Sequence, residues 1–104
     1  MAKILFSPAA LEDMREIKSY ITEELCSEAA AINTVEKITK RIRQLADFPE
    51  LGAPLSSIID IEVPYRFIVC GNYTAFYKMD SNDIHVIRVL YGKRNFMQIL
   101  FGRN

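Results

Sequence analysis

The sequence predicts an α+β fold in which an N-terminal strand and an antiparallel helical hairpin pack on a mostly antiparallel sheet of four or five strands. Two segments in the first half repeat apolar residues every three or four positions, as amphipathic helices do. Runs of β-branched and aromatic residues, separated by turn-forming residues, fill most of the second half. With 104 residues, the chain has room for one domain, which we place at residues 1–104.

The first strand is expected over Lys3–Phe6, a short apolar run. Ser7 and Pro8 then predict the start of a helix, because serine caps free N–H groups and proline is tolerated at the first helical position. This helix should end near Leu25. Its apolar face is expected to comprise Leu11, Met14, Ile17 and Ile21. Its water-facing side is expected to comprise Glu12, Asp13, Arg15, Glu16 and Lys18.

A second helix should begin near Ser27, another capping residue, and should be closed by Phe48 and Pro49. Its apolar positions are Ile32, Val35, Ile38, Ile42 and Leu45. Only a few residues separate the two helices, so we expect an antiparallel hairpin. Each helix has one apolar face, and the pair therefore needs a sheet to cover.

Glycine and proline predict a loop over residues 49–54. The isoleucines that follow favour a short strand over Ile58–Ile61, ended by Pro64.

Three longer strands are expected after Pro64. Tyr65–Cys70 and Tyr73–Met79 should form a hairpin, because Gly71-Asn72 between them suits a tight turn. Ile84–Tyr91 is predicted as the last strand. The apolar tail Phe96–Phe101 should form a helical turn that folds back on the sheet.

The composition excludes several classes of function. Thirteen basic residues balance thirteen acidic ones, so any anion site must be local and a free nucleic-acid binder is disfavoured. Cys26, Cys70 and the lone His85 have no metal-ligand spacing, so we expect no metal and no cofactor. Both cysteines are expected to be buried free thiols in a reducing compartment. No apolar run approaches the ~20 residues that span a bilayer, which predicts a cytoplasmic protein with no membrane partner.

Two arginines lie within apolar strands, where an unpaired charge is costly. Arg66 and Arg88 can therefore be edge charges that prevent aggregation, partners of Glu62 or Asp60 in a salt bridge, or part of an anion site. Strand alternation predicts that Arg66 shares a face with Ile68 and Cys70, and Arg88 with Ile84, Val86 and Leu90.

A basic pair follows the last strand. Lys93 and Arg94 come directly after Gly92 and are flanked by Tyr91 and Asn95. Together with Arg66 they can bind a phosphate, the arginines by a planar fork and the lysine as a point charge. The alternative is a solvated chain end.

Aromatic residues in the strands have two interpretations. Tyr73, Tyr77 and Tyr91 can stack on bases or transfer protons, but strand tyrosines also serve packing. We interpret His85 as a hydrogen-bonded structural group in preference to a general base.

Several segments together resemble the RelE/ParE toxin superfamily over nearly the whole chain. They are Phe6–Asp13, Leu45–Pro49, Gly52–Leu55, Tyr65–Tyr77 and Arg88–Phe96. The resemblance implies the toxin of a type II toxin–antitoxin system, with a cognate antitoxin as its partner and with operator DNA reached only through that antitoxin.

The resemblance leaves three functions open. One branch of the superfamily is similar to ribosome-dependent mRNA endonucleases, in which a ribose 2′-hydroxyl attacks the next phosphate. The other branch poisons DNA gyrase and lacks the catalytic set. A third alternative is an inactive homologue that acts only in an antitoxin–DNA repressor complex. Of the three, ribosome-dependent mRNA cleavage is the leading hypothesis.

The site residues implied by the resemblance are carried over position by position. Arg94 matches the family's C-terminal basic residue. Thr74 stands where many nucleases have an arginine, and Leu100 where they have a tyrosine. The catalytic residues are therefore predicted to be Arg66, Arg94, Lys93 and Tyr91, and the substrate-binding residues Arg88, Tyr73 and Asn95. This hypothesis requires Arg66 and Arg94 to point into one shared cavity.

Overall fold

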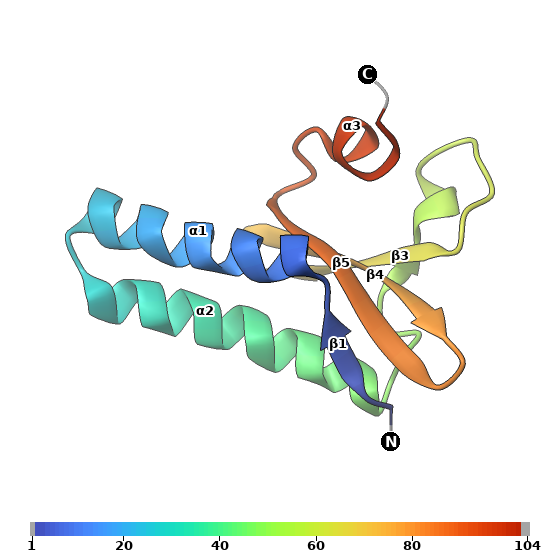
Figure 1. Cartoon of the computed structure of the whole chain (residues 1–104), viewed down its shortest axis with the longest axis horizontal. Helices are drawn as coiled ribbons and strands as arrows, with labels where there is room; N and C mark the ends of the chain where they lie inside the picture. The colour runs from blue at the N-terminus through green and yellow to red at the C-terminus, as the bar shows by residue number, and fades with distance from the viewer. Residues whose placement is uncertain (1, 103–104) are drawn as a thin grey trace.

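The structure, a computed structural model, describes residues 2–102 (Figure 1). In chain order, the elements are β1 (Ile4–Phe6), α1 (Pro8–Leu25), α2 (Glu28–Arg43), a 3₁₀ turn (Gln44–Ala46), β2 (Ala53–Pro54), a second 3₁₀ turn (Leu55–Ser57), β3 (Tyr65–Cys70), β4 (Tyr73–Asp80), β5 (Asp83–Tyr91) and α3 (Phe96–Phe101). The predicted α+β class is confirmed.

The five strands form one sheet in the order β1-β5-β4-β3-β2. Every neighbouring pair is antiparallel except β1 and β5, which are parallel. The predicted turn at Gly71-Asn72 joins β3 to β4, and Gly71 has the positive φ of 64° that such a turn requires. The mostly antiparallel sheet is thus confirmed.

The two helices lie side by side as an antiparallel hairpin (Figure 1). The Ser7 hydroxyl accepts a hydrogen bond from the Ala10 N–H at 3.0 Å and the Ser27 hydroxyl one from the Ala30 N–H at 3.1 Å. Both predicted caps are therefore present. α1 has its predicted bounds, whereas α2 ends at Arg43 and the chain continues as a 3₁₀ turn.

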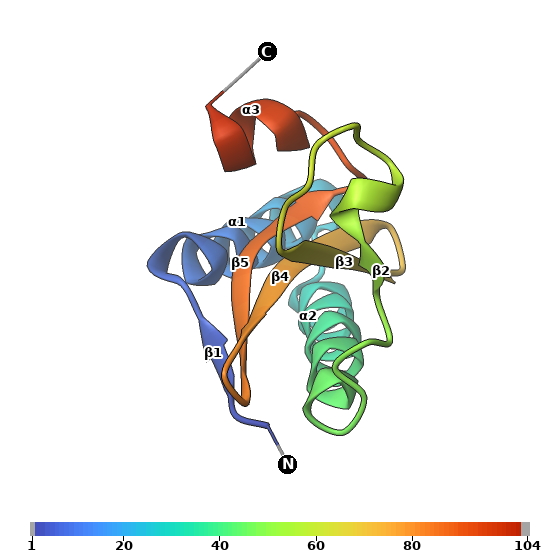
Figure 2. The same cartoon turned by 90° about the vertical axis from the view of Figure 1, so that its right-hand side faces the viewer.

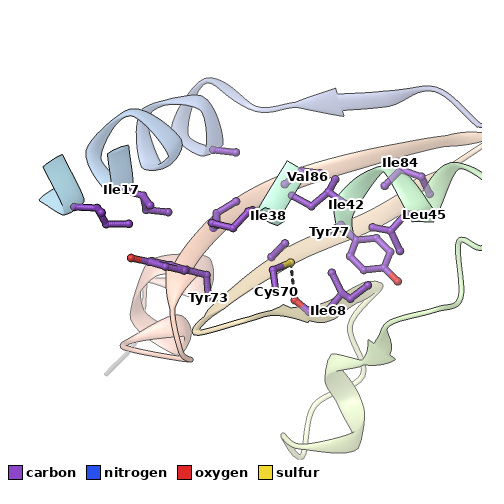
Figure 3. Packing of buried hydrophobic residues seen from close by; sticks show 14 of the residues in the cluster. Ile17, Ile38, Ile42, Leu45, Ile68, Cys70, Tyr73, Tyr77, Ile84 and Val86 are labelled. Atoms are coloured by element: carbon purple, nitrogen blue, oxygen red, sulfur yellow. Dashed lines mark hydrogen bonds between the residues drawn. The ribbon is translucent and has the colours of Figure 1, made fainter. Parts of the chain in front are cut away.

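Apolar side chains fill two clusters on opposite faces of the sheet. The larger cluster lies between the helical hairpin and the sheet (Figure 3), where Ile38, Ile42 and Tyr77 are fully buried. The smaller cluster holds Leu55 and Phe76 and is covered by α3. Figure 2 shows α3 and α2 on opposite sides of the sheet. The tail therefore folds back on the sheet as predicted.

The strand predicted over Ile58–Ile61 is wrong. These residues form turns and bends, and Ile58 and Ile61 are exposed. The edge strand is β2, whose two residues pair with Phe67 and Arg66 of β3. Apolar residues alone suggested a strand here, whereas pairing with β3 determines which residues form one.

The faces predicted for β5 are wrong beyond Ile87, because the strand contains a β-bulge. Tyr77 pairs with Val86 and Phe76 with Arg88, so Ile87 has no partner in β4. One extra residue reverses the alternation that follows it. As a result Ile84 and Val86 lie in the larger cluster, whereas Leu90 lies in the smaller one. Arg88 therefore does not share a face with Ile84 and Val86.

The cysteines match the prediction in part. Both are free, but only Cys70 is buried, and Cys26 is exposed where α1 ends. Burial raises the pKa of the Cys70 thiol to about 11.

Within residues 2–102, no helix is both long and apolar enough to cross a bilayer. The same residues contain no group of three or more His, Cys, Asp or Glu side chains that could hold a metal ion.

Candidate functional site

The start of α1 is fastened to β5. The Ser7 N–H donates to the Val86 carbonyl at 2.9 Å, and the Ser7 hydroxyl donates to the Ile87 carbonyl at 2.7 Å. β1 pairs with β5 only as far as Val86. The start of α1 therefore bonds to the edge of β5 from Val86 onward, where the pairing of β5 with β1 ends.

Asp13, six residues after Ser7, continues this attachment further along α1. Its carboxylate accepts hydrogen bonds from Arg88 Nε at 2.7 Å, from Arg88 Nη2 at 2.8 Å and from the Val89 N–H at 2.9 Å. The bond to Asp13 is the main reason that the pKa of Arg88 is raised. This buried carboxylate thus satisfies both an edge N–H group and a strand arginine.

A groove of about 660 Å³ opens beside this ion pair, between α1 and the end of β5. α1 contributes Asp13, Glu16, Ile17 and Tyr20 to its lining. The strands and the chain that follows them contribute Tyr73, Arg88, Val89, Leu90, Tyr91, Arg94 and Ile99. We refer to these residues as the groove. Its lining holds two acidic and two basic residues, so its formal charge is balanced.

Two tyrosines and an arginine form one wall of the groove. The rings of Tyr73 and Tyr91 meet edge to face, with centroids 5.5 Å apart. Arg94 Cζ lies 5.9 Å from the centre of the Tyr91 ring. Burial, and then the nearby Tyr91 and Tyr20, raise the pKa of Tyr73. Tyr91 and Arg94 are exposed whereas Tyr73 is buried, so the first two can reach a partner.

The two basic residues of the turn after β5, Lys93 and Arg94, lie in different surroundings. Gly92, with φ 58°, donates its N–H to the Asn72 carbonyl, which ties this turn to the β3–β4 turn. Arg94 then lines the groove, whereas Lys93 Nζ lies 5.0 Å from the ring centre of Phe67 in the smaller cluster. Asn95, with φ 51°, begins α3 without a side-chain cap bond and does not line the groove.

Arg66 binds backbone carbonyls at the other end of the sheet. Its Nη2 donates to the Gly52 carbonyl at 2.6 Å and to the Glu50 carbonyl at 3.3 Å. Neither Glu62 nor Asp60 pairs with it or with Arg88. Arg88 therefore forms a structural salt bridge, as one alternative expected, but its partner is Asp13. Arg66 instead donates to backbone carbonyls of the 49–52 loop.

In the part of the chain that the structure describes, Arg66 and Arg94 lie in different places, not in the shared cavity that was expected. Arg66 pairs with Tyr77 of β4, whereas Arg94 follows the end of β5 that pairs with Tyr73. Tyr73 and Tyr77 are four residue steps apart along β4, which is about 13 Å of backbone. Arg66 does not line the groove. Alternation along β3 predicted the face of Arg66 but carried no information on its distance from Arg94.

Sequence reasoning missed three groove residues on α1: Asp13, Glu16 and Tyr20. Asp13 was expected to face water, but it lies three residues after the buried Ala10 and four before the buried Ile17. That spacing places it on the buried face of the helix. An acidic residue in register with buried positions was the signal that could have identified it.

The chain is similar to known proteins over most of its length. Residues 4–96 match a family model described as the ParE toxin of a type II toxin–antitoxin system, parDE. A search of curated proteins returned no significant match.

Two solved structures support the fold. One is from the chromosomal ParDE toxin–antitoxin system of P. aeruginosa, with a TM-score of 0.72 and 19% identity, covering 88% of this chain and 96% of that one. The other is the toxin–antitoxin complex RelBE2 from Mycobacterium tuberculosis, with a TM-score of 0.55 and 18% identity, covering 86% and 96%.

Proposed function

The chain belongs to the ParE toxin family of type II toxin–antitoxin systems, and from this membership we propose that it arrests growth by binding DNA gyrase. On this proposal the toxin acts as a protein ligand and cuts no RNA. A cognate antitoxin is its partner in the cell. The groove is the surface that engages the target.

The dispersal of the predicted nuclease residues carries this proposal. Arg66 is bound to carbonyls of the 49–52 loop, and Arg88 is bound to Asp13. Thr74, at the position where a nuclease would have an arginine, is buried. Among residues 2–102, Arg94 is therefore the one groove arginine whose charge is not bound to a carboxylate. Stabilising the charge that develops on a phosphate needs several donors aimed at one point, and a single arginine does not provide them.

The charges of the groove also disfavour RNA as its ligand. Asp13 and Arg88 neutralise each other, which leaves Glu16 and Arg94 as the lining charges that form no ion pair with another residue of 2–102. An RNA site is expected to have an excess of cations along the path of the phosphates. A lining that carries one further carboxylate and one further guanidinium is better suited to a protein surface that carries both signs of charge.

The exposed residues of the groove are types that bind proteins well. Tyr20 and Tyr91 are 61% and 57% exposed, and Arg94 lies over the Tyr91 ring. Tyrosine and arginine are enriched among the interface residues that contribute most to binding energy. The edge-to-face contact with the buried Tyr73 holds the Tyr91 ring in place, which lowers the entropy lost on binding.

Ribosome-dependent mRNA cleavage is the second candidate function. The observation in its favour is that Tyr91 and Arg94 lie together in the groove, since a tyrosine beside a cation can transfer a proton. In that case the buried Tyr73 would only support the Tyr91 ring from behind, and Arg66 would contribute nothing from the far end of the sheet.

A paired assay with the purified chain tests the proposal. DNA supercoiling by purified gyrase is measured as the toxin is added, and mRNA bound to purified ribosomes is incubated with the same toxin stock. We expect loss of supercoiling and intact mRNA. Cleaved mRNA with normal supercoiling would establish the second candidate, and no effect in either assay would favour an inactive homologue.

A further inference from the structure

The backbone of the loop over residues 48–52 is hydrogen-bonded to two side chains of the sheet, Tyr77 and Arg66. The Tyr77 hydroxyl donates to the Pro49 carbonyl at 2.8 Å and accepts from the Gly52 N–H at 3.2 Å. Arg66 donates to the carbonyls of Glu50 and Gly52. Tyr77 is fully buried. Four hydrogen bonds with two strand side chains therefore hold the backbone of this loop.

This loop presents apolar side chains to solvent. Phe48 is 64% exposed and Leu51 is 42% exposed, and Met79 at the end of β4 is 40% exposed beside them. Phe48, Leu51 and Met79 line one depression of about 520 Å³ together with Pro49 and Glu50. We call these five residues the platform. Exposed apolar residues on an ordered backbone are a feature of interaction sites.

A second depression, of about 360 Å³, adjoins the platform and shares Pro49 and Met79 with it. Of the residues that the structure describes, the charged ones lining the two depressions are all acidic: Asp47, Glu50 and Asp83. The groove, by contrast, has balanced charge. A ligand that matches the platform must therefore be apolar at its centre and basic at its edge.

We propose that the platform binds a segment of the antitoxin that carries apolar side chains on one side and lysine or arginine beside them. Phe48, Leu51 and Met79 would contact the apolar side chains, and Asp47, Glu50 and Asp83 would pair with the basic ones. Arg66 acts as a positioning residue, because it fixes the loop that displays Phe48 and Leu51.

The place of the platform indicates the antitoxin in preference to the target. Tyr73, which lines the groove, begins β4, whereas Met79 lies near the other end of the same strand. This choice rests on the proposed function, in which the groove engages the target. On the proposed function the toxin has two protein partners, the target and the antitoxin. If the target binds the groove, the platform remains available to the antitoxin.

The chemistry is tested with two designed helical peptides that share the same leucine positions. One carries lysine at its other positions and the other carries glutamate. Binding to the full chain is measured by fluorescence anisotropy at low and high ionic strength. We expect the lysine peptide to bind and to weaken with salt, and the glutamate peptide to bind at least about tenfold more weakly. Equal binding of the two peptides would overturn the proposal.

Two variants locate the binding surface. Phe48→Ser combined with Leu51→Ser should weaken binding of the lysine peptide about tenfold or more. The matched control is Leu11→Ser combined with Ile32→Ser, which removes two similarly exposed apolar side chains of the helical hairpin and should leave binding unchanged. Glu50→Lys, which deletes no apolar surface, should also weaken binding. Full binding by the Phe48/Leu51 variant would contradict the proposal.

Growth arrest by the same variants separates this proposal from the proposed function. Expressed without antitoxin, the Phe48/Leu51 variant should remain as toxic as the unaltered chain, whatever the cellular target is. Loss of toxicity in a variant whose circular dichroism is unchanged would assign the platform to the target and overturn its assignment to the antitoxin. The gyrase and ribosome assays test the target independently.

Discussion

The Asp13 carboxylate binds the Arg88 guanidinium through two hydrogen bonds of 2.7 and 2.8 Å, across 75 residues of sequence. The same carboxylate accepts the Val89 N–H. This pair joins α1 to the edge of β5 next to the bulge at Ile87. It also makes Arg88 a structural residue and so removes one cation from the groove.

Replacing Asp13 by alanine should destabilise the fold strongly. Both bonds to Arg88 and the acceptor for the Val89 N–H are lost, and a partly buried guanidinium is left without its partner. We expect the free energy of unfolding to fall by about 2–4 kcal/mol, as measured by urea denaturation.

The matched control for Asp13 is Glu12→Ala, which removes the exposed ion pair between Glu12 and Arg15. Exposed pairs contribute little, so this change should stay within about 0.5 kcal/mol. Equal effects of the two substitutions would show that the Asp13–Arg88 pair does not hold α1 to the sheet.

The elements that could be predicted correctly were those marked by residues close to one another in the sequence. Ser7 and Ser27 marked the starts of both helices, and Gly71-Asn72 marked the β3–β4 turn, because capping and turn chemistry involve residues close in sequence. β2 carried no such signal, since its two residues form a strand only by pairing with β3.

The buried thiol of Cys70 should make stability depend on alkaline pH. Its pKa is raised from 9.0 to about 11 by burial, so between these values the unfolded chain loses the thiol proton while the folded chain keeps it. Unfolding is therefore favoured as the pH rises. Over this range the unaltered chain should lose more stability than Cys70→Ala, which lacks the group. Parallel curves for the two proteins would contradict the buried state of the thiol.

Gly52 should not tolerate a side chain. A Cβ at this position would collide with the Phe67 carbonyl oxygen and would lie 2.7 Å from the Tyr77 hydroxyl oxygen. Because the first of these atoms is backbone, Gly52→Ala should cost about 1–3 kcal/mol of stability.

Gly71 provides the comparison for Gly52. Its φ is positive, but no atom lies within 4 Å of an added Cβ, and asparagine tolerates this backbone conformation. Gly71→Asn should therefore cost less than about 1 kcal/mol. Thermal denaturation of both variants measures the difference, and a Gly52 variant as stable as the Gly71 variant would argue against close packing beneath the 48–52 loop.

The two basic residues after β5 should differ in their effect on toxicity. Arg94→Ala and Tyr91→Ala alter the groove and should relieve growth arrest on induced expression, with the antitoxin still bound. Lys93→Ala should remain toxic, because Lys93 lies over Phe67 and outside the groove. If Lys93→Ala also relieves the arrest, Lys93 acts beside Arg94, as the nuclease hypothesis requires.

The candidate site was predictable only in part, for reasons of distance. Tyr73, Tyr91, Arg88 and Arg94 were identified from their residue types near strand ends, and all four line the groove. Arg66 was a residue of the right type at the wrong end of the sheet. The bulge at Ile87 left no pattern in the sequence, so the faces of β5 could be assigned only from strand pairing.

Parallel labelling of DNA and protein synthesis after induction of the toxin tests most directly whether it poisons gyrase. Cells that express the unaltered chain are compared with cells that express Arg94→Ala. DNA synthesis should fall first in the former and continue in the latter, with protein synthesis declining only later. A fall in protein synthesis within minutes, while DNA synthesis continues, would contradict gyrase as the target and favour the second candidate function.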